Sequence, residues 1–276
     1  MNNNHKYIVS FSGGHSSAIC AIECVRKYGK ENVILLNHDI SEEVEDHDIK
    51  RFKNEVAAYL GIEITYANME GWETKTPLRV CKEIGGFKFG NGSALCTTYL
   101  KTKPFNKWLK KNYPVKKGNV RKDITIIYGF DKEETIRIQR RIGVMISSGY
   151  KTDFPLAFWK RTIQNTEEIG IARPNTYKLF RHGNCKGCLK AGKQQWYLTY
   201  CLYPELWEEA KATEKEIGYS ILKDTFLEEL ESKFSSMKCK GIVPTEKLQS
   251  QSFWAEVKKA LPADGQLSFL PCECAI

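Results

Sequence analysis

Residues 7–29, YIVSFSGGHSSAICAIECVRKYG, decide the fold. The first five, Tyr7–Phe11, are mostly apolar and predict a short buried strand. Apolar residues then recur at helical spacing from Ser16 to Tyr28, and Gly29 follows as a stop signal. Between these elements lie Ser12–Ser17, the residues SGGHSS. The stretch therefore predicts a strand, a glycine turn and a helix.

Three further strands are predicted by short apolar runs at Val33–Leu36, Ile62–Tyr66 and Ile124–Tyr128. A helix lies between the first two, because apolar residues recur at helical spacing from Ile49 to Leu60, just before Gly61. Strands that alternate with helices predict a mainly parallel sheet with helices on its faces. We therefore expect an α/β fold.

The pattern changes after Asp153 to loops rich in aromatic residues and then to helices, predicted at Pro204–Ile217 and Thr225–Met237. We expect an α/β domain over residues 1–150 and a smaller helical and loop region over residues 151–276, with a CxxC pair and a cysteine-rich tail. The long excursion over residues 72–122 is expected to hold functional loops and one or two helices.

Composition narrows the class of protein. The 276 residues are 42% apolar, which suffices for an ordinary soluble core and excludes a disordered or fibrous chain. The longest aliphatic run, Val33–Leu36, is far shorter than the roughly 20 residues of a membrane helix, and the start MNNNHKY has no apolar signal core. We expect a cytoplasmic protein without a membrane partner, in which most of the ten cysteines are reduced.

The turn SGGHSS has the composition of an anion site. Two glycines let successive N–H groups face one point, the start of the helix adds partial positive charge, and the serine hydroxyls are further donors. No lysine follows the glycines as in GxxxxGK[ST], and the spacing is not GxGxxG. A phosphate or sulfate site is predicted; the alternative is a tight turn with Ser12 as a helix cap.

The run Ser10–Ser17, SFSGGHSS, resembles the loop of the phosphoadenosine phosphosulfate (PAPS) reductase family, within the PP-loop nucleotide α-hydrolase superfamily. In that family SFSGG precedes a variable residue, Asp and Ser, and here Ser16 stands in the place of the Asp. The resemblance implies a Rossmann-like domain that binds an adenine nucleotide, ATP or PAPS, with Mg²⁺ as a candidate cofactor. The implied nucleotide-binding residues of the loop are Ser10, Ser12, Gly13, Gly14, His15, Ser16 and Ser17.

Two more segments extend the resemblance. Asn37–Ile40 stands in the place of the family's Asp-Thr-Gly element, which implies that Asp39 lies near the adenosine. The segment Gly129–Arg137 resembles the family's G…E[ST]xxR pattern and implies roles for Gly129, Glu134 and Arg137. Arginine forks suit phosphate oxygens, so we expect an anion clamp of Arg137, Arg140 and Arg141; the alternative is a solvated basic helix face.

The cysteines of the middle of the chain resemble part of a cluster motif. One branch of the family holds a 4Fe-4S cluster on a mid-chain Cys-Cys pair and a later CxxC, and here Cys96, Cys185 and Cys188 match three of those four positions. An open iron would suit sulfur transfer, and a distant cysteine or His182 is a candidate fourth ligand. Zinc and a metal-free pair remain alternatives, because CxxC also serves those uses.

The residues Glu273, Cys274 and Ile276 resemble the tail of the reductases, in which a cysteine attacks the sulfonyl sulfur. The resemblance implies Cys274 as the nucleophile, with Arg137 neutralising charge and a thioredoxin-like protein as the reductant. The alternative is a disordered tail with two incidental thiols.

Positive charge is concentrated in one segment. Lys101–Asp123 holds nine of the 42 basic residues and one of the 33 acidic ones, interleaved with Phe105, Trp108 and Tyr113. This composition is typical of a surface that follows a phosphate backbone, so nucleic acid is a predicted partner through Lys101–Lys122. The alternative is a solvated helix face with buried aromatics, and Lys101 is also a candidate contact to the nucleotide, since it lies in a family-like CTxxLKxxP run.

Three functions follow from these patterns. The first is a PAPS-reductase-like enzyme that performs sulfur chemistry through cysteine thiolates or an iron–sulfur cluster. The second is an ATP pyrophosphatase that adenylates an oxygen or base of a nucleic acid and then delivers sulfur from a cluster on Cys96, Cys185 and Cys188; this resembles the relatives that thiolate tRNA or DNA. The third is an inactive module that senses a nucleotide, which the replacement of the loop Asp by Ser16 favours.

Overall fold

The computed structural model of this protein describes residues 5–90, 92–116 and 118–261. The chain forms two compact units: Met1–Lys75 with Thr97–Tyr177, and Thr76–Cys96 with Lys178–Ile276. This division differs from the boundary predicted near residue 150. The first unit extends further because a fifth strand follows that point, and because Leu156, Ile163 and Ile171 are buried in its core.

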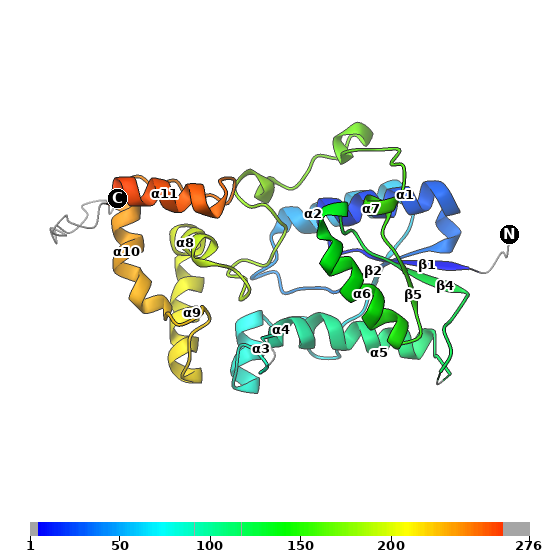
Figure 1. The fold of residues 1–276 in the computed structure, drawn as a ribbon, viewed down its shortest axis with the longest axis horizontal. Coiled ribbons are helices and arrows are strands. Elements are labelled where there is room, and N and C mark those ends of the chain that lie inside the picture. The colour runs from blue at the N-terminus through cyan, green and yellow to red at the C-terminus, as the bar shows by residue number, and fades with distance from the viewer. Residues whose placement is uncertain (1–4, 91, 117, 262–276) are drawn as a thin grey trace. The chain divides into compact units, whose positions relative to one another are not determined.

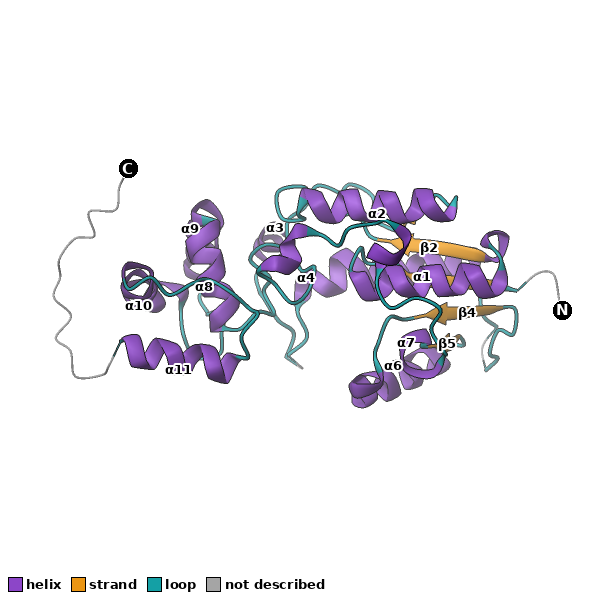
Figure 2. Cartoon of the chain, turned by 90° about the horizontal axis from the view of Figure 1, so that it is seen from above, coloured by secondary structure: helices purple, strands orange, loops and turns teal. Residues whose placement is uncertain are grey.

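The first unit is built on a five-stranded sheet with the order β3-β2-β1-β4-β5, in which every neighbouring pair is parallel. The strands are β1 (Lys6–Ser10), β2 (Val33–Asn37), β3 (Ile64–Tyr66), β4 (Ile124–Ile127) and β5 (Lys151–Asp153). The arrowheads of β2 and β4 point the same way in Figure 2. The predicted parallel α/β sheet is confirmed. The sequence did not predict β5, since KTD is short and polar.

Helices cover both faces of this sheet (Figure 1). Because side chains alternate along a strand, Val9 and Leu35 pack on one face with α1 and α2, whereas Ile8 and Leu36 pack on the other with α5 and α6. The helices of this unit are α1 (His15–Tyr28), α2 (His47–Leu60), α5 (Lys103–Asn112), α6 (Thr135–Ser147) and α7 (Pro155–Phe158).

The predicted excursion before β4 contains α3 (Pro77–Ile84), α4 (Leu95–Thr97), a π-helical segment η2 (Thr98–Thr102) and α5. Short 3₁₀ turns complete the connections: η1 (Lys30–Asn32), η3 (Lys132–Glu134), η4 (Thr166–Ile169) and η5 (Asn175–Lys178). No helix in the described ranges is both long and apolar enough to cross a membrane.

The second unit is helical. Besides α3, it contains α8 (Lys193–Leu202), α9 (Pro204–Ile217), α10 (Leu227–Cys239) and α11 (Ser250–Ala260). Its core holds Trp196, Trp207, Phe234 and Phe253, each at most 1% exposed. The helix predicted at Pro204–Ile217 is confirmed, and the one predicted over residues 225–237 lies two residues later. The helix α8 has no amphipathic periodicity by which it could be predicted, because its residues from 194 to 199 are all buried.

Candidate functional site

The glycine loop lies at the centre of the sheet's carboxyl edge. The connections from β1 lead through β2 to β3 on one side, whereas β4 lies on the other side of β1. This reversal is the topological switch point of a doubly wound sheet, where such folds bind their ligands. The loop Ser12–Gly14 therefore occupies the position from which a ligand at that point would be held.

Gly13 adopts a conformation that only glycine accepts readily, with φ of 78°. A β-carbon there would lie 2.6 Å from Cγ of Lys53 and 3.1 Å from Cγ2 of Ile49, both on α2. Lys53 is 1% exposed and its ammonium is 2.8 Å and 3.0 Å from the two carboxylate oxygens of Glu45. The loop thus rests on a buried lysine whose charge is already paired.

The strand β4 supports the loop from the other side through Gly129. A β-carbon at Gly129 would lie 3.1 Å from the carbonyl carbon and oxygen of Ser16 and 3.2 Å from the nitrogen of Ser17. These are backbone atoms, which cannot rotate away. The glycine that opens the G…E[ST]xxR-like segment is therefore required for close approach to the first turn of α1.

The first turn of α1 carries the donors of the candidate site. The N–H of His15 donates to the hydroxyl oxygen of Tyr177 at 3.0 Å, and the N–H groups of Ser16 and Ser17 follow in a turn that lacks intrahelical partners. This turn contains no acidic residue, so the partial positive charge of the helix start is not offset locally. Ser17 Oγ donates to the carbonyl of Gly14 at 2.8 Å, which leaves the exposed Ser16 hydroxyl as the outward-facing one.

His15 is held neutral beside this turn. Burial lowers the pKa of its imidazole, and the positive charge of Arg173 lowers it further. Its Nε2 is buried and has no hydrogen-bond partner within the described residues. His15 therefore adds no charge to the predicted anion site.

The loops that follow β2 and β3 are tied together. Nδ1 of His38 lies 2.5 Å from the carbonyl oxygen of Ala67, so this nitrogen carries the proton, and burial lowers the pKa of His38 to about 4. The side chain of Asn68 accepts from the N–H of Asp39 at 2.9 Å and donates to its carbonyl at 2.7 Å. The Asp39 carboxylate projects with 40% of its side-chain surface exposed, 3.3 Å from Lys50.

Lys101 belongs to the same edge. Its positive charge contributes to the lowered pKa of His38, and the ring of Phe105, four residues after Lys101, lies 6.5 Å from the ring of His38. The side chain itself is exposed. Its side chain is therefore accessible to a nucleotide, and the contact itself stays a prediction.

The segment after β4 forms its own network. Glu134 caps η3 by accepting from the N–H of Asp131 at 3.0 Å, and its other oxygen lies 2.6 Å from Nη1 of Arg137. The Arg137 guanidinium also covers the ring of Phe130 at 4.0 Å. These contacts pair the two charged members of the family-like segment with each other.

The other two arginines of the expected clamp lie further along α6. Arg141 covers the ring of Tyr128 at 5.0 Å, and Arg140 is exposed. Within the described residues, neither these two nor Arg137 hydrogen-bonds to the glycine loop. The anion clamp stays a prediction.

The predicted cluster ligands all belong to the second unit. Cys96 is 9% exposed and lies beside Cys81, whose pKa is raised to about 12 mainly by burial. Cys185 and Cys188 are half-buried. No group of three or more His, Cys, Asp or Glu side chains that could hold a metal occurs in the part of the chain that the structure describes. The described side chains thus do not form a ready cluster or Mg²⁺ site, and Cys274 lies outside the described residues.

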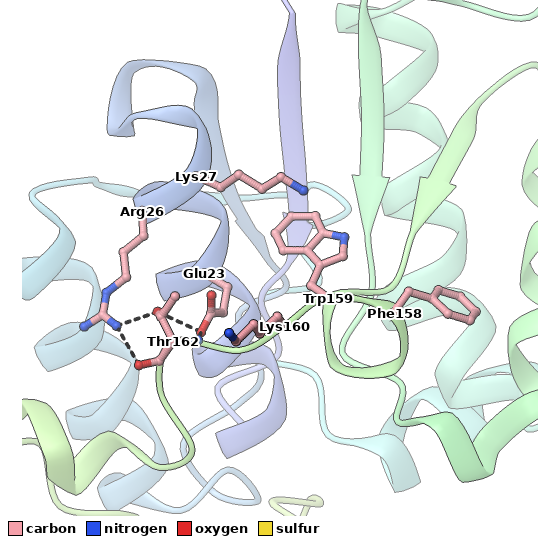
Figure 3. Close-up of a pocket in the computed structure, with 7 residues that line it drawn as sticks. All are labelled: Glu23, Arg26, Lys27, Phe158, Trp159, Lys160 and Thr162. Atoms are coloured by element: carbon pink, nitrogen blue, oxygen red, sulfur yellow. Dashed lines mark hydrogen bonds between the residues drawn. The ribbon is translucent and has the colours of Figure 1, made fainter.

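A hollow of about 430 Å³ opens beside the C-terminal half of α1 (Figure 3). Its lining residues are Glu23, Arg26, Lys27, Phe158, Trp159, Lys160 and Thr162. Glu23 accepts hydrogen bonds from the N–H groups of Thr162 and Ile163, and Arg26 donates to the Thr162 hydroxyl, so these groups bind the chain after α7 to α1. Glu23 follows His15 by about 12 Å along the helix at 1.5 Å per residue, so this hollow is separate from the glycine loop.

Sequence reasoning missed three groups that shape the site: Tyr177, Asn68 and the Lys53–Glu45 pair. Each comes from a segment distant from the glycine loop, and no local pattern marks a lone tyrosine, an asparagine or a buried lysine. Lys53 follows the buried Phe52 on α2, but that position alone does not distinguish a buried lysine from an exposed one.

Comparison of the chain with models of protein families, with curated proteins and with solved structures found no match.

Proposed function

We propose that this chain binds an adenine nucleotide, ATP or PAPS, at the carboxyl edge of its sheet, and that it is a PAPS-reductase-like PP-loop enzyme of sulfur chemistry. One observation carries the binding proposal. Gly13 has a φ that favours glycine, and Gly129 has no side chain to press on the backbone of Ser16 and Ser17. These two glycines hold the first turn of α1 at the switch point, with its N–H groups toward the carboxyl edge of the sheet.

The nucleotide's parts fit different residues of this edge. Phosphate or sulfate oxygens would accept from the N–H groups of Ser16 and Ser17 and from the Ser16 hydroxyl. The adenosine would lie toward the loops after β2 and β3. There, hydrogen bonds with Asn68 and Ala67 hold Asp39 and the uncharged His38 in place. The adenine itself is proposed from the family resemblance, since the loop geometry supports only an anion.

Two chemistries are compatible with such a site. In the reductase, the Cys274 thiolate attacks the sulfonyl sulfur of PAPS, the bond from sulfur to the nucleotide phosphate breaks, and a thioredoxin-like dithiol supplies the two electrons that release sulfite. In the sulfurtransferase, an acceptor oxygen or base is adenylated by ATP with release of pyrophosphate. The tail residues favour the first, and the basic segment before β4 favours the second.

The products separate these chemistries. The full chain is incubated with ATP or with PAPS plus a thioredoxin system, and AMP, pyrophosphate and sulfite are quantified for wild type, Cys274→Ser and Arg137→Ala. Sulfite that disappears with Cys274→Ser supports the reductase; pyrophosphate that survives it supports the transferase. Nucleotide binding without either product would identify a sensor, and no binding of either nucleotide would contradict the whole proposal.

A further inference from the structure

One surface of the first unit carries positive charge that is not paired with any acidic side chain among the described residues. It is formed by exposed lysines on α5 and its flanking segments, here called the lysine track: Lys101, Lys103, Lys107, Lys110, Lys111, Lys116 and Lys122. None of them forms an ion pair within the described residues, whereas Lys50, Lys53, Lys211 and Lys215 all do. The one acid of the segment, Asp123, is paired with Arg121. The track is therefore available to an external polyanion.

The helix α5 arranges four of these lysines in a row. Its inner side is fixed by Pro104, Phe105 and Leu109, which are buried against the sheet. Residue 107 follows residue 103 by four positions and precedes residues 110 and 111 by three and four, so the four lysines share the opposite side of α5 over about 12 Å at 1.5 Å per residue. Burial of Phe105 also removes it from the aromatics that the sequence offered for base stacking.

An aromatic stack lies at the start of the track. The rings of Trp72 and Tyr99 are 5.5 Å apart and inclined by only 15°. The Nζ of Lys103 lies 3.5 Å from the centroid of the Tyr99 ring, and the Nζ of Lys75 lies 4.2 Å from that of Trp72. Both rings are partly exposed, and Tyr99 lies in the π-helical segment η2, a rare geometry that is frequent at functional sites.

These features select one class of partner. A lipid surface would need an exposed apolar face on α5, but that face is buried in the core. An acidic peptide could form ion pairs with the lysines, but its carboxylates would not stack on the rings of Trp72 and Tyr99. A single-stranded nucleic acid uses both, since its phosphates follow a row of cations and its unpaired bases stack on aromatic rings.

We propose that the lysine track and the Trp72–Tyr99 stack together bind a single-stranded nucleic acid. The start of α5 connects this surface to the candidate site, because the ring of Phe105 lies 6.5 Å from the ring of His38 after β2. A strand bound along α5 would reach the carboxyl edge, where it would be the acceptor of the transferase chemistry. That last role rests on the proposed function; the binding itself does not.

Binding is tested with the full chain and fluorescent 20-nucleotide probes of mixed sequence, as single-stranded DNA, single-stranded RNA and duplex DNA, without added nucleotide. The track variant is Lys107→Glu, Lys110→Glu and Lys111→Glu. The control variant is Lys223→Glu, Lys258→Glu and Lys259→Glu, which makes the same change in net charge at exposed lysines of the second unit. A Trp72→Leu, Tyr99→Leu variant tests the stack, and circular dichroism checks that each variant is folded.

We expect the wild type and the control variant to bind single strands alike, and the track variant to bind at least tenfold more weakly. Losing three phosphate contacts should make the slope of log K against log salt shallower by about 2. The stack variant should lose about tenfold for single strands and little for the duplex. Equal binding by track and control variants would overturn the proposal, as would a preference for duplex. Because no ATP or PAPS is present, this outcome is independent of the proposed nucleotide site.

Discussion

The backbone N–H of His15 donates a hydrogen bond of 3.0 Å to the hydroxyl oxygen of Tyr177. This oxygen lies where a phosphate oxygen would sit at the start of α1, and it would be 3.3 Å from a β-carbon at Gly14. An anion that also binds the N–H of His15, beside those of Ser16 and Ser17, must therefore displace Tyr177 or share that N–H with it. The contact makes the tyrosine a competitor for the site.

Tyr177→Phe should increase affinity for ATP or pyrophosphate by about fivefold, because a hydrogen bond worth roughly 1 kcal/mol no longer has to be broken. Titration calorimetry of the variant and the wild type measures this change. Weaker binding by the variant would instead mean that the hydroxyl contacts the ligand.

Gly129→Ala should lower both the free energy of unfolding and the affinity of the site for an anion. Its new methyl group would press on the backbone of Ser16 and Ser17 at 3.1–3.2 Å, and such overpacking costs about 1–3 kcal/mol of the free energy of unfolding. Anion affinity should fall at least tenfold as the turn shifts. Gly143→Ala is the matched control: it lies inside α6 with no atom within 4 Å of the added carbon, so it should be neutral or slightly stabilising. Urea unfolding and calorimetry on both variants check this, and equal behaviour of the two would show that the close approach is unimportant.

Lys53→Met should lower the free energy of unfolding by about 3 kcal/mol, since it leaves the Glu45 carboxylate largely buried without its partner. Adding Glu45→Gln should restore much of this loss, because the uncompensated charge is gone. Urea unfolding of the single and double variants measures the difference. If the double variant is no more stable than Lys53→Met, the loss of charge pairing with Glu45 does not account for the stability lost when Lys53 is replaced.

Because of His38, we expect the free energy of unfolding to depend on pH. Its pKa is about 4 in the folded chain against an ordinary value of 6.5, chiefly because of burial. The unfolded chain therefore binds the proton more readily between these values, so stability falls as pH drops from about 6.5 to 4, by roughly 2 kcal/mol for this group. His38→Gln should flatten that part of the profile of free energy of unfolding against pH. An unchanged profile would show that His38 is not buried as described.

The sequence predicted the parts of the fold that depend on local signals. The strands rich in Val, Ile and Leu and the helices that end at Gly29 and Gly61 all lie within two residues of their predicted bounds. The strand β5 and the helix α8 could not be predicted, the first because it is polar and short, the second because burial on all sides removes periodicity.

The residues of the candidate site likewise include some that local motifs indicate and others that they do not. The glycine loop and Gly129 stand in contiguous motifs, so a resemblance could indicate them. Tyr177, Asn68 and Glu45 act through contacts that form only when distant segments meet, and single polar residues carry no pattern that announces this. The pairing of Arg137 with Glu134 follows from spacing of three on a helix, yet the sequence favoured a free guanidinium.

The most direct test of the account is a calorimetric titration of the full chain with ATP and with PAPS, each repeated on Gly129→Ala and on Gly143→Ala. The account predicts one binding site for at least one of the nucleotides, lost or weakened at least tenfold by Gly129→Ala and unchanged by Gly143→Ala. Absence of binding by the wild type, or binding that Gly129→Ala leaves intact, would contradict it.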